Sequence, residues 1–126
     1  MNTILIQHLF QEELYHIHYK AVVVLAKPWE DHSPEDVALL SKILGSVKLS
    51  LASVHIVVKP TVMLQSLADY PASKILLFGS QIDQEIKAYE NVSHQNFSVI
   101  RADDLGQLDD TKKRNLWLAL RQMFGV

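Results

Sequence analysis

Four short apolar runs, with helical segments between them, most constrain what this chain can fold into. The runs are Ala21–Ala26, Val54–Val58, Lys74–Phe78 and Phe97–Ile100. Apolar residues that follow one another without alternation are typical of strands covered on both faces, as in parallel sheets. Strands that alternate with helices predict a mostly parallel sheet with helices on both faces. We therefore expect a three-layer α/β/α fold with four or five strands.

The first predicted helix has a strong start signal. Ser33-Pro34-Glu35-Asp36 combines a serine cap, a proline at the first helical position and acids in the first turn. It predicts a helix from Pro34 to about Leu44 that ends at Gly45.

The last predicted helix covers residues 112–123 and begins near Asp109 or Asp110, either of which can cap it. Its apolar stripe is formed by Leu116, Trp117, Leu120 and Phe124.

Three further helices are predicted from weaker signals. Helical spacing of Leu5 and Leu9 favours a helix over residues 4–15. Thr61 is expected to cap a helix through Ala68, and Ser80 or Gln81 to begin a short helix whose inward residues are Ile82, Ile86 and Tyr89.

Length and composition limit the class of protein. The chain has 126 residues, of which 48% are hydrophobic, which suffices for a single domain over residues 1–126. It contains no cysteine, and no apolar run approaches the length of a membrane helix. We expect a cytoplasmic protein without membrane contact. The formal net charge of −2 gives no basic excess for nonspecific binding to nucleic acid.

Ligands of open α/β sheets bind outside the carboxyl ends of the strands, where this chain has few recognisable reactive groups. Trp29 lies beside Glu30, Asp31 and His32, an arrangement that fits an aromatic platform with a base and an acid. The same residues are also typical of a solvated loop before a helix cap, and we favour that interpretation. Lys27, Trp29 and Arg101 are the candidate residues of a nucleic-acid or ligand cleft.

No cofactor, metal ion or catalytic residue is expected. Four glycines in the chain are too few for a phosphate-binding glycine loop, and Gly79-Ser80-Gln81 lacks the pattern of a nucleophile elbow. His16 and His18 have a spacing that some zinc sites use, but no motif supplies a third ligand.

The carboxy-terminal third resembles uracil-DNA glycosylase-like domains. Asp110–Leu120 matches a helix with a Leu-Trp pair, and Lys74–Ser80 matches a strand and glycine turn. The resemblance implies the same fold. The two catalytic loops of those enzymes are absent, since the corresponding segments here are Lys27–Asp31 and Arg101–Leu105.

Most of the chain resembles the psi subunit family of the bacterial DNA polymerase III clamp loader, in which a glycosylase-like fold carries no catalytic motif. The corresponding segments occur in the same order, namely Leu9–Tyr15, Val22–Ala26, Ser33–Asp36 and Arg114–Trp117. The chain differs from the family at Gln11-Glu12-Glu13, where the family has a basic leader.

The resemblance implies a non-enzymatic interaction subunit of a clamp loader or another DNA-replication assembly, associated with DNA only indirectly. Residues 1–20 are expected to bind other protein subunits through the anchors Leu5, Leu9, Phe10 and Tyr15. The alternative is a DNA-base-recognising or glycosylase-related enzyme in which Trp29 stacks on a base. A small-molecule sensor is a third interpretation.

Overall fold

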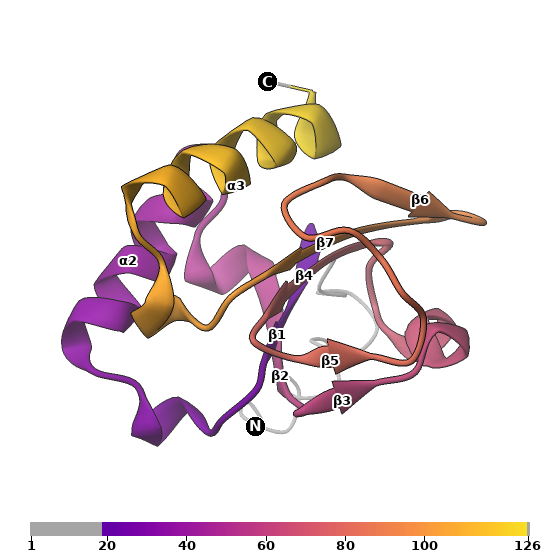
Figure 1. Cartoon of the computed structure of the whole chain (residues 1–126), viewed down its shortest axis with the longest axis horizontal. Helices are drawn as coiled ribbons and strands as arrows, with labels where there is room; N and C mark the ends of the chain where they lie inside the picture. Colours follow the sequence, from indigo (N-terminus) through magenta and orange to yellow (C-terminus); the bar gives the residue numbers. More distant parts are fainter. Residues whose placement is uncertain (1–18, 126) are drawn as a thin grey trace, which may run out of the picture.

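The computed structural model describes residues 19–125, which are organised around a five-stranded sheet (Figure 1). The strand order is β2-β1-β4-β7-β6, and all neighbouring strands are parallel except β6 and β7. The strands are β1 (Ala21–Leu25), β2 (Val54–Val58), β4 (Lys74–Phe78), β6 (Val92–His94) and β7 (Phe97–Ala102). The predicted α/β fold with a mostly parallel sheet is confirmed.

The four apolar runs form β1, β2, β4 and β7. Every residue of β1 is fully buried, and Val23 pairs with Ile56 of β2 on one side and Leu76 of β4 on the other. Apolar side chains are favoured in such a strand, because both of its faces are removed from water and a polar side chain would lose its hydration there. The run Ala21–Ala26 therefore placed the centre of the sheet correctly.

Two α-helices, α2 (Pro34–Gly45) and α3 (Asp110–Phe124), begin at the expected caps. The backbone N–H of Asp36 donates to Ser33 Oγ at 3.1 Å, and the N–H of Lys112 donates to Asp109 Oδ1 at 2.8 Å. Helix α3 ends at Gly125, whose φ of 68° is the left-handed conformation that favours glycine.

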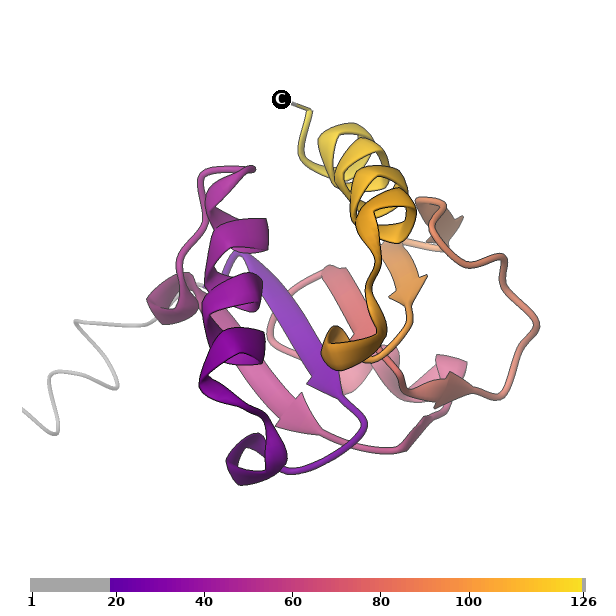
Figure 2. The same cartoon turned by 60° about the vertical axis from the view of Figure 1, so that its left-hand side comes forward.

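Both α-helices cover the same face of the sheet (Figure 2), and η4 (Leu105–Gln107) packs beside them. Their buried side chains include Leu40, Leu44, Leu116, Leu120 and Met123. Trp117 was expected in this buried stripe, but 41% of its surface is exposed. Ala119 and Met123 face the core instead.

The opposite face is covered differently from the expectation. In residues 19–125 it is covered by a two-stranded sheet of β3 (Thr61–Val62) and β5 (Gln81–Ile82) and by the 3-10 helix η3 (Leu64–Asp69). The predicted second layer of α-helices is therefore wrong for this part of the chain.

The β3–β5 pairing replaces the helix predicted after Ser80, and it shortens the helix predicted from Thr61 to the 3-10 helix η3. Thr61 begins β3 instead of capping a helix, and the segment after Ser80 forms β5. The N–H of Gln81 donates to the Pro60 carbonyl at 2.8 Å, and Asp83 Oδ1 accepts the N–H of Leu64 at 2.7 Å. These bonds join segments far apart in the sequence, which local helical spacing does not reveal.

The remaining elements are short. The 3-10 helices η1 (Trp29–Asp31) and η2 (Leu51–Ser53) follow β1 and precede β2. Strand β6, which was not predicted, forms a hairpin with β7 around Gln95, whose φ is 53°. In the part of the chain described here, no helix has the length and apolar character needed to cross a bilayer.

Candidate functional site

The carboxyl ends of β1 and β4 form the topological switch point of the sheet. The chain leaves β1 toward β2 on one side and later returns to β4 on the other. Open α/β sheets bind ligands in the crevice at such a point. Residues 26–33, 79–80 and 103–106 follow β1, β4 and β7 there, so a ligand site of this fold would be formed by these residues.

Close backbone packing at Gly79 fills the switch point. Gly79 has a φ of 80°, and a β-carbon added to it would lie 3.1 Å from Asp104 Cβ and 3.3 Å from Ala26 Cβ. The N–H of Gly79 also donates to the Ala102 carbonyl at 2.9 Å. The segments that follow three strands thus pack closely at Gly79, and a side chain at this position would not fit between Ala26 and Asp104.

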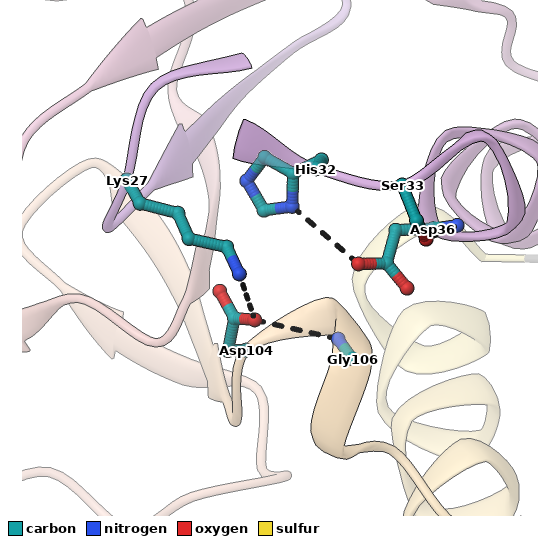
Figure 3. A network of polar contacts seen from close by, with 6 residues as sticks. All are labelled: Lys27, His32, Ser33, Asp36, Asp104 and Gly106. Carbon is teal, nitrogen blue, oxygen red and sulfur yellow. Dashed lines mark hydrogen bonds and ion pairs between the residues drawn. The ribbon is translucent and has the colours of Figure 1, made fainter. Parts of the chain in front are cut away.

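The charged groups above this contact bind one another. Lys27 Nζ lies 3.5 Å from Asp104 Oδ2, and the same oxygen accepts the N–H of Gly106 at 3.4 Å (Figure 3). Asp104 is the cap of η4. The predicted cleft residue Lys27 therefore has its charge offset by a carboxylate that also holds the η4 turn in place.

His32 lies next to this network with a side chain that is 0% exposed. Its Nδ1 is 3.8 Å from Asp36 Oδ2, too long for a hydrogen bond, and neither ring nitrogen has a hydrogen-bond partner among the described residues (Figure 3). A general base must reach the proton that it removes. A fully covered imidazole does not reach a substrate in this conformation.

The other two predicted cleft residues lie on different faces of the sheet. Trp29 packs against the core under α2 and α3, with its ring 6.2 Å from that of His32. In β7, Ile100 and Ala102 belong to that same core, so strand alternation places Arg101 on the opposite face. The structure does not bring Arg101 together with Lys27 and Trp29.

A second polar cluster fixes the connection between β5 and β6. The Tyr89 hydroxyl donates to Asp103 Oδ2 and accepts the N–H of Asp103 at 3.1 Å, while Lys112 Nζ lies 3.3 Å from the same carboxylate. Burial, with help from the bond to Asp103, raises the pKa of Tyr89 to about 12. The hydrogen bond from Tyr89, with help from Lys112, lowers the pKa of Asp103 below its usual value.

This cluster is structural in character. Tyr89 has a φ of 61°, a left-handed conformation that is unfavourable for a bulky residue and is held by its bonds to β7. A phenol whose pKa is raised to about 12 stays protonated at neutral pH. Sequence analysis missed the cluster because its members are 14 and 9 residues apart, without a local pattern.

A groove lies between α2 and α3, here called the α2–α3 groove, and Trp117 is the exposed large apolar residue that lines it. Its apolar lining is formed by Leu39, Ile43, Leu116, Trp117 and Leu120. The predicted anchors Leu5, Leu9, Phe10 and Tyr15 lie outside the described residues. The sequence predicted Leu116, Trp117 and Leu120 as part of one apolar stripe of the last helix, but it did not indicate a groove beside that stripe.

Within residues 19–125, no group of three or more histidine, aspartate or glutamate side chains is arranged to hold a metal ion. A comparison with models of protein families finds no match, and comparisons with curated proteins and with solved structures find none either.

Proposed function

We propose that this chain is a non-enzymatic protein-interaction subunit, a psi-like component of a DNA polymerase III clamp loader or of another DNA-replication assembly. The observation that carries the proposal is the closed switch point. Gly79 contacts Asp104 and Ala26 where an α/β enzyme would bind its substrate.

The side chains around this point favour binding over turnover. Lys27 is paired with Asp104, and His32 is fully covered. Catalysis requires a group that contacts the reacting atoms in the transition state. Neither residue meets that requirement in the arrangement described.

The apolar surface supports a docking role. Trp117 and Leu118 of α3 are 41% and 46% exposed, and aromatic side chains in apolar surroundings dominate the energy of many interfaces. The leader, defined as residues 1–18, carries the further anchors Leu5, Leu9 and Phe10. Exposed apolar side chains on α3, together with the apolar residues of the leader sequence, support a role in binding partners.

The proposal is tested by affinity capture with purified clamp-loader subunits. The double substitution Leu9→Ser and Phe10→Ser should abolish capture of those subunits, because it removes two apolar anchors. The matched control Gln11→Ser changes a neighbouring polar residue and should leave capture unchanged. Equal capture by all three proteins, or capture by none, would discard the docking role of the leader.

The rival interpretation, a base-recognising enzyme, is tested on uracil-containing and abasic DNA. We expect no product from the native chain. Product formation that is lost in Trp29→Ala and Asp31→Asn would establish the enzyme and overturn the proposal.

A further inference from the structure

The α2–α3 groove is long enough to hold a helix. It consists of two adjoining pockets of about 210 Å³ and about 400 Å³, which share Leu39, Lys42 and Lys113. The first pocket extends to Ser46 and Leu120, and the second to Asp36 and Leu108. Together they follow α2 over nearly its whole length of 12 residues.

The groove combines an apolar floor with positive charge at its middle. Leu39, Ile43 and Leu116 line the floor beside the half-exposed ring of Trp117. Lys42 and Lys113 belong to both pockets, and neither ammonium group forms an ion pair or hydrogen bond with any residue from 19 to 125. The second pocket also contains Glu35 and Asp36, so positive charge predominates in the first pocket, where an occupant should be apolar and acidic.

The leader has this chemistry. Residues 1–18 contain Glu12 and Glu13 and no lysine or arginine, so their formal charge is −2. The remaining residues contain 12 basic and 14 − 2 = 12 acidic side chains, so the net charge of the chain resides in the leader. Leu5, Leu9 and Glu12 or Glu13 follow one another at helical spacing, which places apolar and acidic groups on one face.

The attachment point of the leader lies at the matching end of the groove. The N–H of Lys20 donates to the Ser53 carbonyl at 2.9 Å, and residues 46–53 join the end of α2 to β2 at this same edge of the sheet. A helix over residues 4–15 would be about 18 Å long, similar to α2. Residues 16–18 would span about 10 Å when extended.

We propose that residues 4–15 of the leader bind as an acidic amphipathic helix in the α2–α3 groove of the same chain. Because the carboxyl end of the leader joins the domain where α2 ends, its helix runs parallel to α2. Glu12 and Glu13 then come level with Lys42, and Leu5 and Leu9 lie toward the second pocket. The groove shelters the anchors of the leader until a partner competes for them.

The test uses the full chain, which has no natural cysteine, with a nitroxide spin label on Ser41→Cys. Ser41 is exposed on α2 next to Lys42 and lines neither pocket. The matched control is a label on Glu85→Cys, exposed in the segment between β5 and β6. In NMR spectra, the Ser41 label should strongly reduce the amide signals of residues 4–15, and the Glu85 label should leave them intact.

Reversing the charges of the groove and of the leader provides an independent test of the inference. Lys42→Glu with Lys113→Glu should restore the leader signals in the Ser41-labelled chain to full intensity. Adding Glu12→Lys and Glu13→Lys should bring the signal loss back, because the charges are again opposite.

Three outcomes would overturn the inference. The first is that the Ser41 label leaves the leader amide signals unaffected, and the second is that both labels reduce these signals equally. The third is that the reduction disappears when the labelled protein is diluted with unlabelled chain, which would indicate that a second copy occupies the groove. The inference does not depend on partner identity. A leader that docks in the groove while capture of clamp-loader subunits fails would contradict the proposed function alone.

Discussion

Gly79 lies so close to Asp104 that a β-carbon at position 79 would approach the β-carbon of Asp104 to 3.1 Å. The contact joins the turn after β4 to the segment after β7 at the point where α/β enzymes bind ligands. This position needs glycine for two reasons, since its φ is 80° and its surroundings leave no space.

Gly79→Ala should lower the free energy of unfolding by about 2–4 kcal/mol, from left-handed strain and overpacking together. Urea denaturation measures the change. The matched control is Gly45→Ala at the end of α2, where nothing lies within 4 Å, and it should raise stability by about 0.5–1 kcal/mol. An unchanged stability of Gly79→Ala would mean that the switch point is open.

His32→Leu should be neutral or should stabilise the fold by about 1 kcal/mol at neutral pH. The imidazole is fully buried without a hydrogen bond to the described residues, and an apolar side chain of similar size avoids the cost of desolvating its nitrogens. Thermal or urea unfolding is the measurement. A loss above about 1 kcal/mol would show that a ring nitrogen has a partner in solution.

Tyr89→Phe should cost about 1 kcal/mol of stability at neutral pH, because it removes the hydrogen bond to Asp103. The difference between the two proteins should depend on pH. The raised pKa of Tyr89 makes its contribution complete below pH 10 and lost as pH rises through about 12. The lowered pKa of Asp103 makes its contribution present above pH 3.8 and lost as pH falls further.

Urea denaturation of both proteins across this range checks the prediction, and the two stability curves should converge at the acidic and alkaline ends. A difference of the same size at every pH would indicate lost packing of the phenol instead of a lost hydrogen bond.

Trp117→Ser should cost less than about 1 kcal/mol, since 41% of the residue is already exposed. Leu120→Ala, one turn further along α3 and fully buried, should cost about 2–5 kcal/mol. Urea denaturation of both variants shows whether Trp117 contributes less to the free energy of unfolding than a core residue does. Equal losses would place Trp117 in the core, as its sequence position suggested.

Features that depend on residues adjacent in the sequence were predicted correctly. The cap at Ser33 and the fully buried run of β1 depend on neighbours in the sequence, so they could be recognised from it. The β3–β5 pairing could not be recognised, because it joins Thr61 and Gln81, which are 20 positions apart in the sequence. The spacing of Ile82 and Ile86 resembled a helix, although Ile82 packs from β5 and Ile86 from the irregular segment that follows it.

The candidate site was predictable only in part. The sequence indicated that chemistry, if present, would follow β1 and β4, and it identified Lys27 and Trp29 there. It gave no sign that Asp104 would pair with Lys27 and close the crevice, because that contact joins residues 77 positions apart. The sequence also did not show that Arg101 lies apart from Lys27 and Trp29, because this depends on which residues of β7 face each side of the sheet.

Isothermal titration calorimetry of the native full chain distinguishes docking to protein subunits from recognition of DNA bases. The chain should be titrated in parallel with purified DNA polymerase III clamp-loader subunits and with uracil-containing DNA. We expect saturable heat with the protein subunits and none with the DNA. Saturable heat with the DNA and none with the subunits would contradict the proposed function.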